Sequence, residues 1–348
     1  MGFPLGDYID RHAGVPHHLA ESGMNGSLSL PRPTAREVRT ASEAELRRRL
    51  AHGLGVGDDR LFLTHGASEA NALAIAYLAR QGPGPVGACR IAFPEYPPLF
   101  DTARWWGYRL VGPGRPAQLA LLSRPNNPTG WLAPREDLGA RLDGAGALVV
   151  DETFREFTRE PSVQRWGWPR LWSTGSFTKV YGADVLRVGF LAVPEREAAS
   201  FARFHGLVTD RVPLHSVATA LTILEERERL LAIVRRLVDR HRALWHRATP
   251  GDRGGGGSTV FDTSIGPDGR AFGRRCLRAG VLVCPGSFFG EPAGVRVCLT
   301  RRSFPSDLAA YLAVRARAVS TAPRPVRAAR SSVPRARVPT GRTAAERP

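Results

Sequence analysis

The stretch Ser176-Phe-Thr-Lys179-Val-Tyr-Gly-Ala-Asp-Val-Leu-Arg187-Val-Gly-Phe190 contains the only lysine of the 348-residue chain. The chain has 49 lysines and arginines in all, so arginine fills every other such position. Arginine supplies positive charge, but its guanidinium stays protonated and cannot form an imine. The retained lysine therefore favours chemistry at nitrogen, with a Schiff base to a carbonyl cofactor as the leading candidate. A genome biased towards arginine codons would also leave one lysine by accident, so the surrounding residues have to decide.

Length and composition favour a globular protein of one large domain or two smaller ones. A hydrophobic fraction of 43% is sufficient for a packed core. The four cysteines show neither CxxC nor metal-ligand spacing, which is typical of a reduced, cytoplasmic setting. Neither a signal peptide nor an apolar run of about 18 residues is recognisable, so no membrane partner is expected.

The net charge of +17 raises the question of a nucleic-acid partner. The segment Val319 to Pro348 holds seven arginines and one glutamate, and elsewhere arginines alternate with acids, as on solvated helix faces. No zinc-finger spacing or RNA-stacking motif accompanies them, so no nucleic-acid partner is expected. The tail 319–348 is rich in Pro, Arg, Ala and Ser without periodicity, which predicts disorder.

Strands and helices alternate through the first two thirds of the chain. We expect helices over 36–54, 70–80 and 100–106, and strands over 60–64, 89–93, 119–122, 147–150, 171–176 and 188–193. This alternation predicts an α/β fold with a mostly parallel sheet. The polar residues of interest follow strand ends, where open α/β sheets bind ligands.

The C-terminal third reads differently. Helices are expected over 217–224, 225–246, 272–279 and 307–317, and strands over 258–261, 281–284 and 295–299, with a flexible break at 254–257. Leu230, Ile233, Val234 and Leu237 are expected to face inward. We therefore expect a large domain over 36–230, a smaller α+β domain over 231–318 joined by an irregular segment 1–35, and the tail 319–348.

Four motifs occur in a fixed order: Asn127-Pro-Thr-Gly130, Asp151-Glu152, Ser176-Phe-Thr-Lys179 and Arg187-Val-Gly189. With this order and spacing, the chain from about Leu19 to Arg317 resembles the class I/II aminotransferases, which include the histidinol-phosphate aminotransferases. These are fold-type I enzymes that use pyridoxal 5′-phosphate (PLP). The resemblance implies a large domain with a mostly parallel sheet, a smaller α+β domain, and a homodimer that moves an amino group between an amino acid and a 2-keto acid.

The resemblance also implies roles for the residues around the cofactor ring. Lys179 would carry the cofactor as an internal aldimine and move the Cα proton. Asp151 would keep the pyridine nitrogen protonated, although an aspartate after a strand also serves as a helix cap. Asn127 would donate to the ring 3′-oxygen, although Asn-Pro is also a common turn. Tyr96 would lie against the ring, or else pack in the core.

The resemblance also implies two sites that bind anions, one for the cofactor phosphate and one for the substrate carboxylate. The cofactor phosphate would be held by Arg187, Ser176 and Thr178 and by the backbone N–H groups of Ala67 and Ser68, where a strand, a glycine turn and a helix follow one another. Arg296 would bind the substrate carboxylate as a bidentate fork. The alternative for Arg296 is a surface position on an edge strand.

The chain departs from the family pattern at three places. Phe154 stands where the family usually has a tyrosine that reaches the ring 3′-oxygen, so the aldimine pKa is expected to be higher than in relatives with the tyrosine. No tyrosine lies in 25–45, where a partner subunit often supplies one to the phosphate. The stretch 108–119 is shorter than usual.

Other functions remain open from the sequence alone. A decarboxylase, lyase or cyclase would use the same residues, because the bond held perpendicular to the ring is the one that breaks. A regulatory or basic binding protein is a further alternative, but no room precedes the fold for a DNA-binding helix-turn-helix. The amino acid or amine substrate cannot be identified, since side-chain pockets of this family lie on variable loops.

Overall fold

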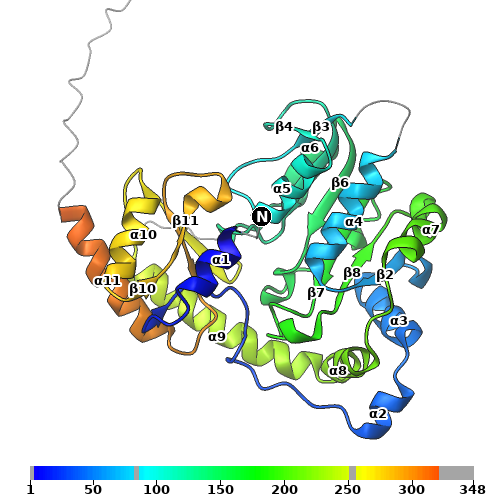
Figure 1. Ribbon diagram of the computed structural model, residues 1–348, viewed down its shortest axis with the longest axis horizontal. Coiled ribbons are helices and arrows are strands. Elements are labelled where there is room, and N and C mark those ends of the chain that lie inside the picture. The colour runs from blue at the N-terminus through cyan, green and yellow to red at the C-terminus, as the bar shows by residue number, and fades with distance from the viewer. Residues whose placement is uncertain (1–3, 82–85, 251–255, 321–348) are drawn as a thin grey trace, which may run out of the picture.

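The computed structural model describes residues 4–81, 86–250 and 256–320, and a seven-stranded sheet forms its centre. The strand order is β2-β8-β7-β6-β5-β3-β4 (Figure 1). The strands are β2 (Leu61–Thr64), β3 (Ala88–Arg90), β4 (Arg109–Val111), β5 (Ala117–Ser123), β6 (Ala145–Asp151), β7 (Leu171–Ser176) and β8 (Gly189–Ala192). All neighbours pair in parallel except β8, which is antiparallel to both β2 and β7. The expected mostly parallel sheet is confirmed.

Helices cover both faces of this sheet because its central strands are apolar on both sides. In β5, Leu119 and Leu121 pack against one helical layer, whereas Ala120 and Leu122 pack against the other, as the alternation of side chains along a strand requires. The first layer contains α4 (Ala67–Ala79), α5 (Pro97–Trp105) and α7 (Ala198–Val208). The second contains α6 (Arg135–Leu142).

The C-terminal part has its own small antiparallel sheet of order β11-β12-β9. It comprises β9 (Thr259–Asp262), β11 (Cys284–Pro285) and β12 (Val295–Cys298), and it packs with α10 (Gly269–Arg278) and α11 (Phe304–Ser320). Helix α9 (Arg227–Ala248) runs from this part to α8 (Leu214–Glu225) beside the large sheet (Figure 1). One hydrophobic core extends across both parts.

The prediction of an irregular segment over residues 1–35 was wrong for residues 4–11 and 17–18 and correct for residues 19–34. Helix α1 (Pro4–Arg11) and strand β1 (His17–His18) form there, and β1 pairs in parallel with β10 (Val281–Leu282). Helix α1 buries Leu5 against Leu282 and Phe289 of the C-terminal part. The start of the chain therefore packs against residues 281–289, which lie far away in the sequence.

Three further expectations need correction. The single helix expected over 36–54 is two helices, α2 (Ala35–Thr40) and α3 (Glu43–Leu54), because Ser42 caps α3 with its side chain. Ile233 is 42% exposed and does not face the core, whereas Leu230 and Val234 do. Strand β4 and helix α6 were not anticipated. The expected tail 319–348 lies almost wholly outside the described residues, as does half of the break at 254–257.

Candidate active site

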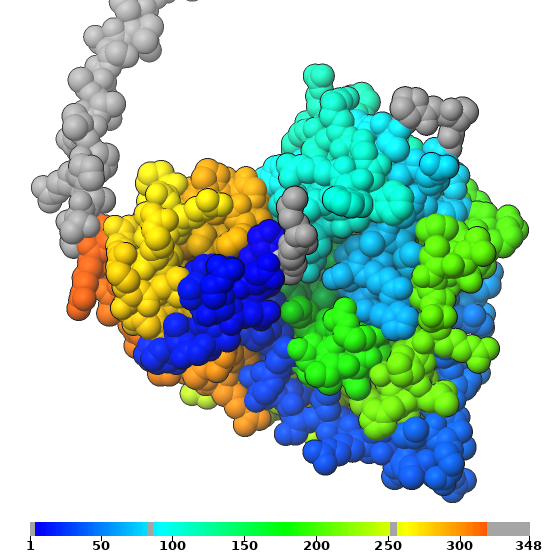
Figure 2. Space-filling model, in the orientation of Figure 1, coloured from blue at the N-terminus to red at the C-terminus, as the bar shows by residue number. Residues whose placement is uncertain are grey.

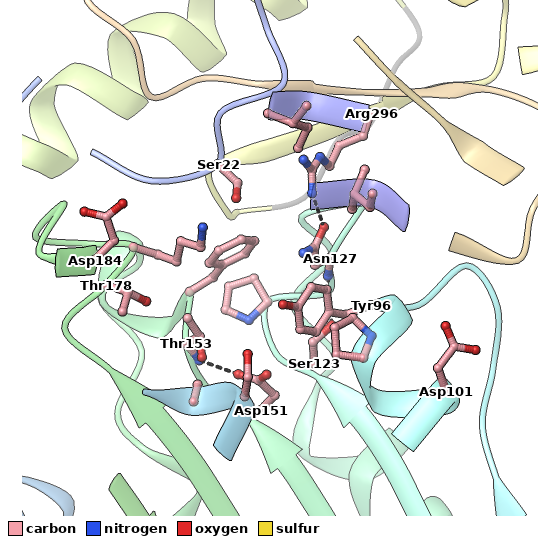
Figure 3. Close-up of a pocket in the computed structure, with 18 of the residues that line it drawn as sticks. Ser22, Tyr96, Asp101, Ser123, Asn127, Asp151, Thr153, Thr178, Asp184 and Arg296 are labelled. Carbon is pink, nitrogen blue, oxygen red and sulfur yellow. Dashed lines mark hydrogen bonds between the residues drawn. The ribbon is translucent and has the colours of Figure 1, made fainter. Parts of the chain in front are cut away.

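A cavity of about 580 Å³ lies at the edge of the large sheet where β5, β6 and β7 end, and the small sheet closes it from the other side. Figure 3 shows Asp151 and Tyr96 on one side of it and Arg296 on the other, with Asn127 between them. Its lining includes nine of the residues predicted from the sequence: Ala67, Ser68, Tyr96, Asn127, Asp151, Thr178, Lys179, Arg187 and Arg296. The sequence-predicted residues therefore converge on one space.

Lys179 follows β7 by three residues, and its side chain is partly exposed. Its backbone is fixed because the carbonyl accepts a hydrogen bond of 2.8 Å from Met24 N. Its Nζ forms no hydrogen bond or ion pair with any residue that the structure describes. The amine is therefore available to react with a molecule in the cavity.

Asp151 ends β6 and is only 4% exposed. Its carboxylate accepts hydrogen bonds of 2.7 Å from Asn71 Nδ2 and 2.8 Å from Thr153 N. Burial raises the pKa of Asp151, while the hydrogen bonds from Thr153 and Asn71 oppose this shift. A cation in the cavity would favour the ionised form of Asp151.

Asn71 was missed by the sequence analysis. Its Oδ1 accepts from Thr174 Oγ1 at 2.7 Å while its Nδ2 holds Asp151, so it connects β7 to the carboxylate. The signal was present, since Asn71 is the one amide in the otherwise apolar middle of α4. A buried amide in such a helix needs partners, and a carboxylate is a strong one.

The N-terminus of α4 forms an anion cradle. The N-cap is Gly66, with φ +99°, and no side chain caps the helix, whose first two residues, Ala67 and Ser68, line the cavity. Arg187 lies against this turn, with Nη2 2.9 Å from His65 O and 3.0 Å from where a Cβ on Gly66 would sit. Any side chain at Gly66 would therefore crowd the guanidinium.

Asn127 and Arg296 meet at the opposite wall. Arg296 Nη1 donates to Asn127 Oδ1 at 2.9 Å, which leaves the Asn127 amide nitrogen as the available donor. Arg296 is 2% exposed, and its Nε has no hydrogen-bond partner among the described residues. Since β12 is the central strand of the small sheet, the surface alternative for Arg296 is excluded. The alternative prediction for Asn127 was an ordinary Asn-Pro turn. Asn127 does lie in a turn, and its side chain also contacts Arg296.

Glu95 is a second residue that the sequence analysis missed. It is 1% exposed and accepts from Tyr96 N at 2.6 Å, Ser123 N at 3.0 Å and Asn126 Nδ2 at 3.2 Å, and also from the Ser123 hydroxyl. Burial raises the pKa of Glu95 to about 8, against the pull of these donors. It thereby joins the segment that carries Tyr96 to the loop that carries Asn127.

Ser176 does not line the cavity, contrary to its predicted role at the phosphate. It is the last residue of β7, and its hydroxyl lies 2.7 Å from Thr178 Oγ1, which does line the cavity. Tyr96 is partly buried, and burial raises its pKa to about 12. Phe154 lines the cavity with an apolar ring.

Helix α1 supplies a wall that the sequence did not predict. Pro4, Leu5 and Ile9 line the cavity. Figure 2 shows α1, in dark blue, lying on the C-terminal part at its junction with the part drawn in cyan and green. The sequence held a signal for this helix that was not recognised, since Leu5, Tyr8 and Ile9 recur at helical spacing and pack in one apolar cluster.

Comparison with known proteins identifies the group to which this site belongs. A family model described as aminotransferase class I and II matches residues 113–303, more than half of the chain. The chain belongs to the class I and II aminotransferase family. Members of this family are PLP-dependent aminotransferases, and this chain is one of them.

Two relatives illustrate the breadth of the similarity. A histidinol-phosphate aminotransferase of Symbiobacterium thermophilum is 28% identical over 335 residues, covering 85% of this chain and 90% of the relative. The structure of a mutant aspartate aminotransferase of Thermus thermophilus matches with a TM-score of 0.71 at 22% identity, covering 88% of this chain and 98% of the other. This aminotransferase therefore has the fold-type I architecture that its sequence predicted.

The cavity fits PLP on observations of this structure alone. The uncapped N-terminus of α4 and Arg187 form a place for a phosphate, and the buried Asp151 carboxyl forms no ion pair with any described residue. No group of His, Cys, Asp or Glu within 4–81, 86–250 and 256–320 has the arrangement of a metal site. In the same ranges, no helix is long and apolar enough to cross a bilayer.

Proposed function

We propose that this aminotransferase moves an amino group between an amino acid and a 2-keto acid with PLP held covalently by Lys179. The observation that carries the proposal is the position of the chain's single lysine. Its Nζ has no partner among the described side chains, in a cavity also lined by Asp151, Arg187 and Arg296. Each of these three groups suits one charge of the cofactor or the substrate.

The residues that would hold the cofactor follow from the same contacts. Arg187, Thr178 and the N–H groups of Ala67 and Ser68 would bind the phosphate, with Ser176 orienting Thr178. Asp151 would face the ring nitrogen and Asn127 Nδ2 the ring 3′-oxygen, with Tyr96 against the ring. Arg296 would bind the substrate carboxylate with the donors that Asn127 and Ala20 leave free.

When bound, the cofactor draws electrons away from the substrate carbon that bears the amino group. Once the amino group of the substrate has displaced Lys179 from the cofactor, the freed Nζ would take the proton from this carbon and pass it on as the keto acid forms. Arg296 fixes the carboxylate, so the direction of the Cα–H bond depends on the Arg296–Asn127 contact. Asp151 stays ionised against the ring nitrogen and favours the electron-poor state of the ring.

The proposal includes a homodimer and a cytoplasmic location, as expected from the family resemblance and the cysteines. All four cysteines lie buried and unpaired in the structure, in keeping with a reduced compartment. It also retains the division into a large domain over 36–230 and a smaller one over 231–318. Measurement of the molar mass of the holoenzyme in solution tests the dimer.

The decisive experiment is reduction of the purified protein with borohydride, followed by peptide mass spectrometry. We expect one modified peptide, which contains Lys179. A matched control is Arg236→Lys, which adds an amine at an exposed position of α9 and is expected to remain unmodified. An unmodified Lys179 peptide, or full turnover in Lys179→Arg, would refute the proposal. The visible absorbance should fall with an amino donor and return with a keto acid, whereas carbon dioxide release without keto-acid dependence would indicate a decarboxylase.

A further inference from the structure

A second cavity, of about 470 Å³, lies on the other side of the loop that carries Lys179. Ser176, Phe177, Val180 and Tyr181 of this loop line it, and Thr153 lines both cavities. Its remaining walls come from the end of α3, the segment 152–165 and the region where α8 meets α9. A molecule bound there would contact the backbone segment that positions the amine.

Arginines dominate the lining of this second cavity. Six arginines line it, against three glutamates: Arg49, Arg155, Arg159, Arg165, Arg227 and Arg235, with Glu152, Glu156 and Glu160. Three of the arginines are paired with carboxylates at 3.3 Å or less, namely Arg49, Arg159 and Arg227. The other three determine what the cavity can bind.

Arg155, Arg165 and Arg235 retain unused donors. Arg235 donates its Nε to Glu156 O at 3.0 Å and Arg165 its Nη2 to Gly53 O at 3.1 Å, and no carboxylate in the described part of the chain forms an ion pair with either. Arg155 forms two longer ion pairs, from Nε to Glu152 at 3.7 Å and from Nη2 to Glu156 at 3.6 Å, and its buried Nε has no hydrogen bond to any described residue. Burial lowers the pKa of Arg235, and the charges of Arg227 and Arg159 act in the same direction, although Glu156 and Glu228 oppose them.

The three glutamates neutralise only part of this charge. Glu152 and Glu156 pair with Arg155, and Glu156 pairs with Arg227 as well, but no glutamate of the cavity forms an ion pair with Arg165 or Arg235 in the described part of the chain. Glu152 accepts from Ser162 Oγ at 2.5 Å and from Val163 N at 3.0 Å. Glu156 accepts from Tyr181 Oη at 2.7 Å and from Arg227. Glu160 lies 3.4 Å from Arg124. The cavity thus has an excess of guanidinium donors over available acceptors.

We propose that the cavity lined by Arg155, Arg165 and Arg235 is a binding site for a phosphate group, separate from the cofactor site. Guanidinium groups bind phosphate oxygens through paired, charge-assisted hydrogen bonds. Leu50, Leu54 and Phe177 add apolar wall beside the arginines, so the cavity accommodates a small phosphate ester as well as free phosphate. The inference depends on these contacts alone, so its failure would leave the role of Lys179 untouched.

The test is titration calorimetry of the PLP-loaded holoenzyme, whose own phosphate site is filled, at constant ionic strength. The probes are inorganic phosphate and phenyl phosphate. We expect saturable binding that weakens about tenfold in Arg235→Met, the loss of one charge-assisted group. The matched control is Arg236→Met, which removes the same charge from the next, exposed position of α9 and should leave binding unchanged.

A third variant separates this site from the substrate carboxylate site. Arg296→Lys should leave phosphate affinity unchanged if the phosphate occupies the second cavity. Tighter binding of phenyl phosphate than of phosphate would identify an ester as the ligand class, and equal binding would identify the free ion. Equal weakening in Arg235→Met and Arg236→Met, dependence on Arg296, or no saturable binding of either probe would each overturn the proposal.

Discussion

The guanidinium of Arg296 lies 2.9 Å from the side-chain oxygen of Asn127, and this hydrogen bond joins the small sheet to the loop that follows β5. The same guanidinium also donates to Ala20 O at 2.8 Å, so three separate segments meet at one side chain. The site proposed for the substrate carboxylate and the site proposed for the ring 3′-oxygen are therefore joined by one hydrogen bond.

Replacement of Arg296 by lysine tests this connection. Lysine keeps the charge but cannot donate to Asn127, Ala20 and a carboxylate at once. We expect KM for the amino acid to rise about tenfold to a hundredfold, as for the loss of one charge-assisted contact. Steady-state kinetics would measure this, with Arg301→Lys on the loop after β12 as the control, since Arg301 does not line the cavity. An unchanged KM would exclude Arg296 from carboxylate binding.

Asp151→Asn tests the charge that faces the ring nitrogen. The amide keeps the shape but neither the charge nor the second acceptor, so we expect kcat to fall by about a hundredfold or more, as for loss of a preorganised electrostatic group. Asn71→Ala removes the hydrogen bonds to Asp151 and from Thr174 but leaves the carboxylate charge in place, so its kcat should fall less. Half-reaction rates would measure both, and equal loss in the two variants would argue against a role for the charge itself.

Most strands of the large sheet, though not their order within it, and most residues that line the cavity could be predicted from the sequence, because both depend on local signals. Apolar runs define β5 and β6, and short motifs follow their ends. Helix α1 was not predicted although its apolar residues have helical spacing, and its position over the cavity could not be, because it packs on Leu282 and Phe289 from far along the chain. The antiparallel direction of β8 could not be predicted either. Strand direction depends on the path of the connection between two strands, and the pattern of apolar residues within a strand does not record it.

The roles of Asn71 and Glu95 show where sequence reasoning stopped within the site. Neither belongs to a motif that contacts the cavity. Each acts through a neighbour, Asn71 on Asp151 and Glu95 on Ser123 and Tyr96. Residues that orient others can be recognised only when the partners are placed in space.

Phe154→Tyr tests the departure from the family pattern. Phe154 is buried, lines the cavity and packs edge-on against Phe157 at 5.9 Å between ring centroids. A hydroxyl there would stabilise negative charge on the ring 3′-oxygen, so we expect the pH midpoint of the visible absorbance change to fall. Spectrophotometric pH titration would measure this shift. The control Phe157→Tyr places its hydroxyl outside the cavity, so a similar shift in that variant would contradict this explanation.

Glu95→Gln tests the buried carboxyl through stability. Because its pKa is raised to about 8, native Glu95 holds a proton that the unfolded chain has already released above the ordinary carboxyl pKa. Its contribution to stability is therefore full at acid pH and is lost as pH rises through about 8. The free energy of unfolding of wild type relative to Glu95→Gln should fall between about pH 5 and about pH 8, by up to about 1.4 kcal/mol per pH unit.

Urea unfolding of both holoenzymes at several pH values would measure this difference. The control is Glu136→Gln on α6, an exposed carboxyl whose replacement should leave the pH dependence unchanged. Parallel pH curves for wild type and Glu95→Gln would show that Glu95 has an ordinary pKa.

The reversed strand β8 has one more consequence. Ser176 at the end of β7 pairs with Gly189 at the start of β8, so the segment between them leaves the sheet and re-enters it at the same edge. Lys179 and Arg187 both lie on this loop between β7 and β8. Asp151, Asn127 and Arg296 belong to other segments of the chain. Substitutions in the other segments can therefore change which substrates the cavity accepts. The amine of Lys179 and the guanidinium of Arg187 keep their relative positions, because both lie on this one segment.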